Sequence, residues 1–202
     1  MKSKYTLPKD GGLITANVPS DIICRYEKVP THIFETEYKG VQHVADQIVE
    51  AINNHQGAEP FMLGLTTGRT PLGLYRELVE RHKEGKVSFK NVAVVSLDEF
   101  YPIAPDHQQS RNFRIHEELL NHIDILPENI NIPDATVPVS EISAYCKKYD
   151  EIASKVDFMI IGMGEQGQLG FNEPGSYEKS RTRLVQLSLN SRKIQSKFFS
   201  KE

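Results

Sequence analysis

Three nearly continuous apolar runs constrain the fold of this chain most strongly. They are Phe61–Leu65, Val92–Leu97 and Val156–Ile161. A strand that covers a core with one face alternates apolar and polar residues, whereas a strand that is apolar throughout is buried on both faces. Runs of this kind are typical of a mostly parallel sheet that lies between two layers of helices.

The segments between these runs have helical spacing. Five apolar residues recur every three or four positions and predict one amphipathic helix: Val41, Val44, Ala45, Ile48 and Ile52. Thr70 is expected to cap the next helix, with Pro71 as its first residue. Ser110 and Ser140 are expected to cap two more. A fourth strand is expected at 183–187 and a short helix at 194–198. The sequence therefore predicts an α/β fold with a doubly wound, mostly parallel sheet and helices on both faces.

The composition is that of an ordinary globular protein, and it narrows the function classes. The 202 residues are 39% hydrophobic and 25% charged, with a net charge of -3. A weakly acidic chain does not favour nucleic acid or anionic membrane as a partner. No apolar run is long enough to cross a bilayer, and no secretory signal is recognised at the start. Cys24 and Cys146 are expected to be reduced thiols, so we expect a cytoplasmic protein. Residues 1–30 have weak periodicity, so we expect them to form an irregular arm.

Gly64–Pro71 joins the first strand to the next helix through a turn rich in glycine and threonine. Backbone N–H groups at a helix start, together with hydroxyls, make a site for an anion, most often phosphate. Arg69 stands where a Walker A loop has its lysine, and the glycine spacing differs, so this is not a nucleotide loop of that type. An ordinary capped turn is the alternative.

Asp98 and Glu99 follow directly on the second strand. A half-desolvated carboxylate at a strand end is a candidate general base. The alternative is that Asp98 caps a turn and Glu99 is a solvated neighbour. His107, His116 and His122 have no partner at metal-ligand spacing, so we expect no metal.

Gly162–Gly167 matches the dinucleotide fingerprint in its letters, but the context argues against it. The fingerprint opens a helix and is followed by an acidic residue about 20 positions later. Here Pro174 interrupts the segment soon afterwards, and no acidic residue lies near Leu187. We therefore expect no dinucleotide and no other cofactor.

Taken together, the motifs resemble the glucosamine-6-phosphate deaminase/isomerase family, whose close relatives are the 6-phosphogluconolactonases. The resemblance runs from about Ile33 to the C-terminus. Segments in the family's order carry it: Thr67–Gly73, Val87–Val92, Leu97–Phe100, Asn121–Asn131, Phe171–Ser176 and Ser180–Arg183. The last two match the deaminase branch in particular. The resemblance implies a Rossmann-like domain at 31–202, a sugar phosphate as substrate and a homo-oligomer.

The resemblance also implies roles for individual residues. Asp98 matches the carboxylate that moves a proton between C2 and C1 of the opened sugar, and Glu173 matches the acid of the ring-opening array. Further pocket and phosphate contacts are expected from Glu99, Gln166, Gln168, Asn172, Thr67, Gly68, Arg69, Thr70 and Lys197.

Three departures from the family pattern stand out. Gln166 replaces an aspartate and Gln168 a histidine of the ring-opening array; an amide forms hydrogen bonds but does not titrate near neutral pH. Lys197 replaces a phosphate-binding arginine. Family chains also continue for several dozen residues beyond the position of Glu202, so we expect this chain to lack their C-terminal segment.

These departures leave three functions open. The first is conversion of glucosamine 6-phosphate to fructose 6-phosphate and ammonia, at a rate reduced by the two glutamines. The second is a non-catalytic domain that senses a sugar phosphate. The third is a lactonase, against which Phe171–Pro174 argues.

Overall fold

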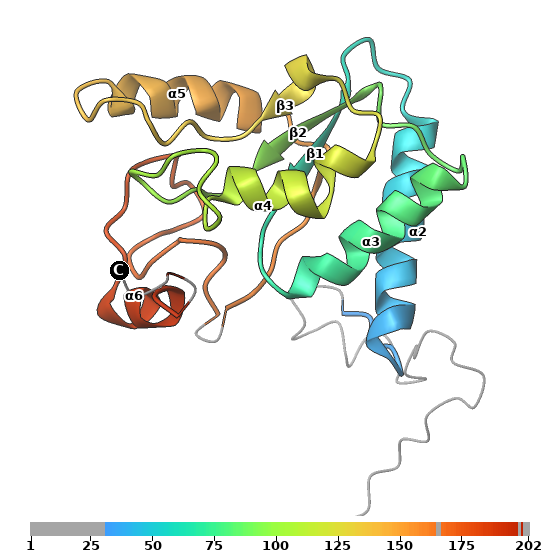
Figure 1. Ribbon diagram of the computed structural model, residues 1–202, viewed down its shortest axis with the longest axis horizontal. Helices are drawn as coiled ribbons and strands as arrows, with labels where there is room; N and C mark the ends of the chain where they lie inside the picture. The colour runs from blue at the N-terminus through green and yellow to red at the C-terminus, as the bar shows by residue number, and fades with distance from the viewer. Residues whose placement is uncertain (1–30, 165–166, 198, 200–202) are drawn as a thin grey trace, which may run out of the picture.

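The computed structural model describes residues 31–164, 167–197 and 199. Within these ranges four parallel strands form one sheet in the order β3-β2-β1-β4 (Figure 1). The strands are β1 (Phe61–Leu65), β2 (Val92–Ser96), β3 (Ile130–Asn131) and β4 (Phe158–Met159). β1 pairs with β2 over its whole length, from Phe61↔Val92 to Leu65↔Ser96. The expected parallel sheet is confirmed, and the N-terminal arm expected at 1–30 lies outside the described residues.

Helices cover both faces of the sheet, as the apolar strands require. The helices are α2 (Glu37–Asn54), α3 (Thr70–Lys83), α4 (Arg111–Glu118), α5 (Ile142–Ala153) and α6 (Leu189–Gln195). Short 3₁₀ turns η1 (Leu120–His122) and η2 (Pro127–Asn129) lie near β3 in the sequence. In Figure 1, α2 and α3 lie side by side, whereas α6 lies well away from the sheet.

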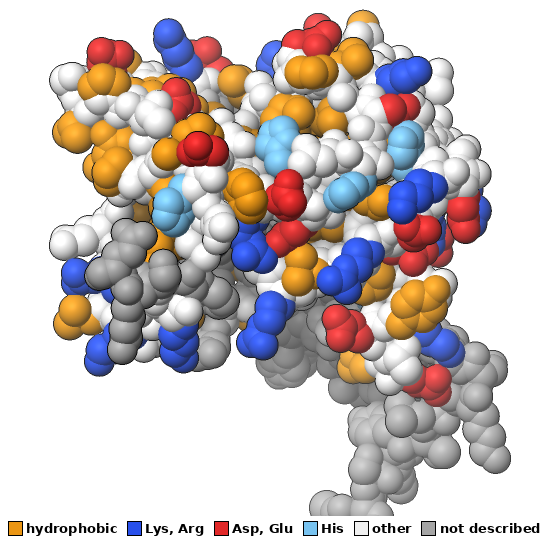
Figure 2. All heavy atoms as spheres, viewed as in Figure 1, with side chains coloured by type: hydrophobic (Ala, Val, Ile, Leu, Met, Phe, Trp, Pro, Cys, Tyr) orange, Lys and Arg blue, Asp and Glu red, His pale blue; other side chains and the backbone are white. Residues whose placement is uncertain are grey.

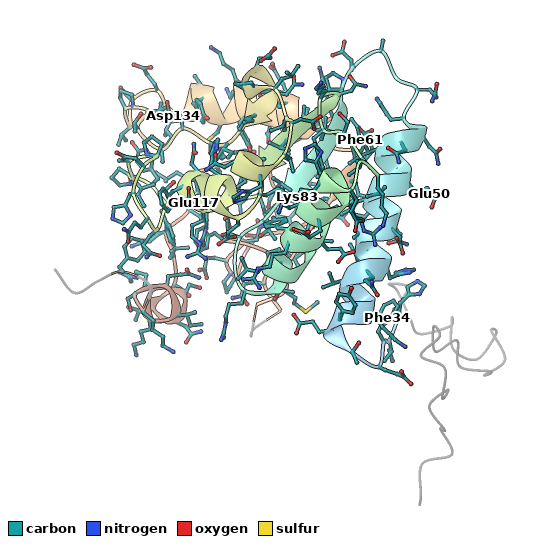
Figure 3. All side chains as sticks on the ribbon, turned by 45° about the vertical axis from the view of Figure 1, so that its right-hand side comes forward. Phe34, Glu50, Phe61, Lys83, Glu117 and Asp134 are labelled. Atoms are coloured by element: carbon teal, nitrogen blue, oxygen red, sulfur yellow. The ribbon has the colours of Figure 1, made fainter. Side chains whose placement is uncertain are left out.

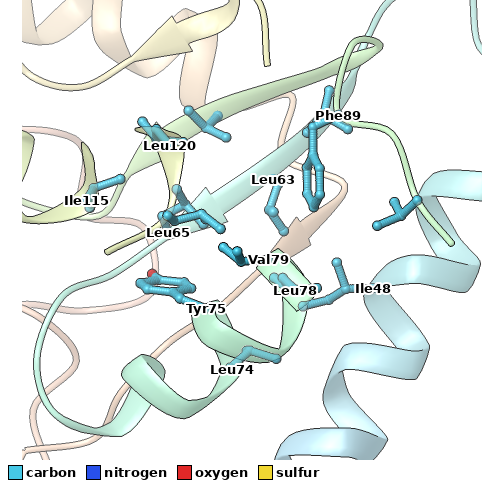
Figure 4. Close-up of a cluster of buried hydrophobic side chains, with 14 of the residues drawn as sticks. Ile48, Leu63, Leu65, Leu74, Tyr75, Leu78, Val79, Phe89, Ile115 and Leu120 are labelled. Atoms are coloured by element: carbon cyan, nitrogen blue, oxygen red, sulfur yellow. The ribbon is translucent and has the colours of Figure 1, made fainter. Parts of the chain in front are cut away.

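Alternate residues of the strands enter two separate cores. Phe61, Leu63 and Leu65 of β1 pack with α2, α3 and α4 in the larger core (Figure 4). Met62 of β1 joins a smaller core on the opposite face, where Tyr149 of α5 covers the sheet. Charged residues such as Glu50 of α2 and Lys83 of α3 lie on the outer surface (Figure 3). This arrangement confirms the doubly wound α/β fold.

Buried tyrosines, one from each face, hold the backbone where β1 and β2 end. The hydroxyl of Tyr75 in α3 accepts a hydrogen bond from the Thr66 N–H at 3.2 Å and donates to the Thr66 carbonyl. The hydroxyl of Tyr149 in α5 accepts from the Ser96 N–H at 3.0 Å and contacts the Ser96 carbonyl at 2.8 Å. Backbone groups that the strand ends expose to the interior are thereby satisfied.

Several local predictions were wrong. No strand forms at 183–187, where the described chain offers no neighbouring strand with which its backbone could pair. β3 lies instead at Ile130–Asn131. α3 begins one residue earlier than expected, so Thr70 is its first residue and Pro71 its second. Ser140 does not cap α5, which follows Glu141 without a side-chain cap. The Ser110 cap is confirmed, since its Oγ accepts from the Phe113 N–H at 3.2 Å.

No described helix combines the length and apolar character needed to span a membrane. On the face shown in Figure 2, acidic and basic side chains are interspersed and neither sign dominates a broad area.

We predict that Tyr149→Phe and Tyr75→Phe each lower the free energy of unfolding by about 1–3 kcal/mol, the usual cost of leaving a buried backbone group without its partner. Urea denaturation measures the change. Tyr38→Phe is the matched control, because the Tyr38 side chain is exposed and its hydroxyl accepts only from Gln42; it should change stability by less than about 0.5 kcal/mol. Equal effects in all three variants would contradict the prediction.

Candidate active site

A cavity of about 170 Å³ lies at the carboxyl end of the sheet, where the loops after β1, β2 and β4 meet. β2 and β4 lie on opposite sides of β1, so the strand order reverses here. Ligands of open α/β sheets bind at such a switch point. The cavity is lined by Thr66, Thr67, Thr70, Pro71, Asp98, Arg111, Gly162, Met163, Gly164, Gln168, Gly170, Phe171 and Gln195.

The loop after β1 supplies one wall of this cavity. Thr67 and Thr70 line it, whereas Arg69 is exposed and is not among the lining residues. Gly68 has φ +123°, a conformation that residues with a Cβ rarely adopt. No side chain caps the start of α3. Its second residue, Pro71, has no N–H, and the Leu72 N–H donates to the Arg69 carbonyl at 3.4 Å, so an anion at this wall would meet the backbone N–H groups and hydroxyls of Thr67–Thr70. Gly68 makes this turn possible.

Asp98 lines the same cavity and lies two residues after the end of β2. Its side chain is only 13% exposed, and its Oδ1 accepts a hydrogen bond from Arg111 Nε at 3.3 Å. Burial raises the pKa of the Asp98 carboxyl above its ordinary value, and the Arg111 charge partly opposes this effect. A carboxyl in this environment can exchange a proton with a bound ligand more readily than a solvated one.

Glu99 has structural partners in this structure. Its carboxylate accepts hydrogen bonds from the backbone N–H groups of Phe100, Arg111 and Asn112 at 2.8–2.9 Å. Ser110 Oγ donates to it as well, at 3.1 Å. The Glu99 carboxylate is thus bound to the first turn of α4. Glu99 lines only the adjoining larger cavity, whereas Asp98 lines both cavities.

The loop after β4 closes the cavity and depends on glycine. Gly167 and Gly170 have φ of +76° and +56°. A Cβ on Gly170 would lie 2.8 Å from Asp98 Oδ2, and the positive φ of Gly170 also disfavours any other residue between this loop and the Asp98 carboxylate. The Gly164 N–H donates to the Gln168 carbonyl at 2.8 Å, which folds the loop back on itself. The Gln168 side chain lies against Gly164 and lines the cavity; Gln166 falls outside the described residues.

The structure does not bring every expected residue to this cavity. Hydroxyls of Ser191 and Ser188 at the start of α6 bond to the Glu173 carboxylate and lower its pKa. Among the described residues, Glu173 lines neither cavity, Asn172 lines only the larger one, and Lys197 is exposed and lines neither.

The larger cavity, of about 800 Å³, adjoins the first and shares Asp98 and Phe171 with it. Residues of α5 and of the segments 97–104 and 180–187 line most of it, and they include both apolar side chains and charged ones such as Arg181 and Arg183. His107 also lines it, with its ring stacked on Phe199 at 5.8 Å between centroids. In the described part of the chain, no three His, Cys, Asp or Glu residues come together as a metal site would require.

Arg111 and Gln195 line the small cavity and escaped the sequence interpretation. Arg111 follows a helix cap, a position that usually carries a solvated side chain. The adjacent carboxylates at 98–99 were the sequence signal that could have indicated a cation nearby. They do not identify Arg111, because an arginine at a helix start can pair with them only if that helix returns to the end of β2.

Comparisons with known proteins agree with this geometry. The family model for glucosamine-6-phosphate isomerases/6-phosphogluconolactonase matches residues 35–185. A glucosamine-6-phosphate deaminase of Porphyromonas gingivalis is 40% identical over 178 residues, which cover 84% of this chain and 66% of the relative. A glucosamine-6-phosphate deaminase of Aliivibrio fischeri is 43% identical over 160 residues, covering 77% and 59%.

Solved structures show the same fold. A monomeric glucosamine-6-phosphate deaminase superposes with a TM-score of 0.74 at 32% identity, over 81% of this chain and 67% of that chain. A 6-phosphogluconolactonase of Thermotoga maritima shares the fold with a TM-score of 0.55 at 24% identity, over 66% and 58%.

The match is extensive in this chain but partial in its relatives, since the alignment spans about three fifths to two thirds of the two deaminases. Because the matched region includes the loop after β1, Asp98 and the loop after β4, the chain belongs to the family of glucosamine-6-phosphate isomerases and 6-phosphogluconolactonases.

Proposed function

We propose that this chain binds a phosphorylated aminosugar in the small cavity and converts glucosamine 6-phosphate to fructose 6-phosphate and ammonia. The observation that carries the proposal is the position of Asp98. A buried carboxylate with a raised pKa shares one cavity with an uncapped helix start, the usual site for phosphate. Relatives at about 40% identity named glucosamine-6-phosphate deaminase support the choice of substrate.

The phosphate fixes the orientation of the substrate in this proposal. Backbone N–H groups of the Thr67–Thr70 loop and the two threonine hydroxyls hold the phosphate at the positive end of α3. The opposite end of the sugar then extends across the cavity toward Asp98. Lys197 has no part in this orientation, because it is exposed and lines neither cavity.

Asp98 performs the proton transfer. As a carboxylate it removes the proton from C2 of the open-chain aminosugar and delivers it to C1. As this proton moves from C2 to C1, a second proton passes from the nitrogen to O1, so C1 becomes a CH2OH group and C2 an imine. Water then adds to the C2=N bond, and ammonia leaves to give the C2 ketone. Desolvation helps because a carboxylate deprived of water accepts a proton more strongly.

Ring opening is the weaker step. The loop after β4 presents Gln168 to the cavity in place of a group that titrates. Glu173 is held at the start of α6 and lines no described cavity. The chain therefore relies on the open-chain form of the sugar, and general acid–base help worth roughly 10²- to 10⁴-fold in rate is missing.

Binding without turnover is the second candidate, and Gln168 in the cavity favours it. Measuring both ammonia release and the affinity for glucosamine 6-phosphate on the full chain separates the two. Affinity without ammonia release would assign a sensing role, and absence of both would overturn the proposed site. A lactonase role draws on the shared fold and on a family model that includes the lactonases, whereas the relatives at about 40% identity are named deaminases. Cytoplasmic location stays an expectation. A homo-oligomer also stays an expectation, since the similar deaminase of known structure is described as monomeric.

We predict that Asp98→Asn lowers the rate of ammonia release at least about 10²-fold, because an amide does not accept the C2 proton. Affinity for glucosamine 6-phosphate should change little, since the phosphate is held on the other wall. Glu84→Gln is the control, because the Glu84 carboxylate is exposed and lines neither cavity. An active Asp98→Asn variant would exclude Asp98 as the base.

We predict that the rate falls on the acid side at a pH above the ordinary range of an aspartate. Asp98 works as a carboxylate, and burial raises its folded pKa, so protonation inactivates it earlier as the pH falls. The linkage to stability has the opposite sign: protonation of Asp98 favours the folded chain as pH falls through this pKa. A pH profile of kcat/KM with no acid limb above pH 4 would contradict the assignment.

We predict that the double substitution Gln166→Asp and Gln168→His raises ammonia release by roughly 10²-fold, the lower range of general acid–base catalysis. The substitution restores titrating groups to the loop after β4. The same exchange in the Asp98→Asn background is the control and should give no gain. If the rate with wild-type Asp98 does not change, ring opening is not the limiting defect.

A further inference from the structure

Arg111 reaches back from the start of α4 to the end of β2 and contacts the proposed base. Its Nε donates to Asp98 Oδ1 at 3.3 Å, and both side chains are 13% exposed. Arg111 lines the same small cavity as Asp98. A charge pair so well shielded from water is only weakly screened, so each partner strongly affects the other.

Aromatic rings from separate loops hold the Arg111 guanidinium. Its Cζ lies 4.5 Å from the centroid of the Phe100 ring and 5.0 Å from that of Phe171. The centroids of these rings are themselves 5.0 Å apart. Phe100 belongs to the loop after β2 and Phe171 to the loop after β4. The cation–π contacts therefore join the loop that carries Asp98 to the loop that closes the cavity.

The backbone of Arg111 is fixed as firmly as its side chain. Glu99 Oε1 accepts from the Arg111 N–H and Glu99 Oε2 from the Asn112 N–H, both at 2.9 Å. The two neighbouring carboxylates thus have different partners. Glu99 accepts from the backbone at the start of α4, and Asp98 accepts from the side chain of Arg111, the first residue of that helix.

We propose that Arg111 is a positioning residue for Asp98: it holds one carboxylate oxygen in place, keeps the group ionised, and couples its orientation to the loop after β4. This inference rests on the proposed role of Asp98 as the base. Arg111 engages Oδ1, while Oδ2 lies beside Gly170 of the loop that closes the cavity. The Phe171 N–H of the same loop also donates to the Asp98 carboxylate, so the carboxylate is held from two sides, by Arg111 and by the loop after β4.

Charges around Asp98 support the role. Burial raises the pKa of Asp98, and Glu99 adds to the rise, while Arg111 and the Phe171 N–H lower it. Burial raises the pKa of Tyr149 in α5, and the negative charge of Asp98 raises it further. Arg111 is therefore the cation that keeps Asp98 ionised against its burial.

The test is an NMR titration of the Asp98 carboxyl carbon in the full chain labelled with ¹³C-aspartate. The signal is assigned by its loss in Asp98→Asn. In Arg111→Gln the titration midpoint should rise above that of the wild type, and Arg111→Lys should bring it back toward the wild-type value. Arg76→Gln removes an exposed arginine of α3 and should leave the midpoint unchanged.

Folding of each variant is checked by circular dichroism. Arg111→Met keeps an unbranched apolar stem against the two rings and replaces Arg111→Gln if the latter does not fold. An unchanged Asp98 midpoint in a folded Arg111→Gln or Arg111→Met variant would overturn the proposal.

The titration needs no turnover, so it decides the proposal even if the chain releases no ammonia. If ammonia release is measured, Arg111→Gln should lower kcat about 10²-fold, since misplacing a catalytic group by about 1 Å costs on that order. The acid limb of kcat/KM should move to higher pH, with KM nearly unchanged. A rise in KM alone would show that Arg111 binds substrate and does not position Asp98.

Discussion

The in-register pairing of β1 with β2 is the constraint on which the site depends. Both strands end at the pair Leu65↔Ser96, and the Leu97 N–H extends the ladder to the Leu65 carbonyl at 2.9 Å. The loop after β1 and the loop that carries Asp98 therefore leave the sheet at the same level. Tyr75 and Tyr149 hold the two strand ends from opposite faces, so the distance across the cavity is set by the packing of helices on both sides of the sheet.

Within this frame Asp98 is subject to opposing effects. Burial favours its neutral form, and Arg111 favours its charged form. Glycine at position 170 lets the loop after β4 approach the carboxylate without a collision. The aromatic contacts of Arg111 connect that approach to the loop after β2. Asp98, Arg111 and the loop after β4 thus form one packed unit.

Part of this site could be predicted from the sequence. Thr67, Thr70, Asp98 and Gln168 follow strands or precede helices, and parallel strands bring such positions to one edge; all four line the small cavity. The partners of Glu99 and Glu173 could not be predicted, because each carboxylate pairs with a helix start 12 or more residues away. Arg111 was missed for the same reason, and the strand expected at 183–187 failed because β-propensity says nothing about an available partner.

The sequence by itself determined the fold class, the family and the positions of the loops that carry the chemistry. These properties follow from local patterns: apolar runs that must be buried on both faces, helical spacing, and short motifs in a fixed order. Only the tertiary structure decided which carboxylate lines the small cavity, which one anchors a helix, and which cation pairs with Asp98. Such choices depend on distances between segments that packing alone brings together, and a buried charge takes whichever partner the fold supplies.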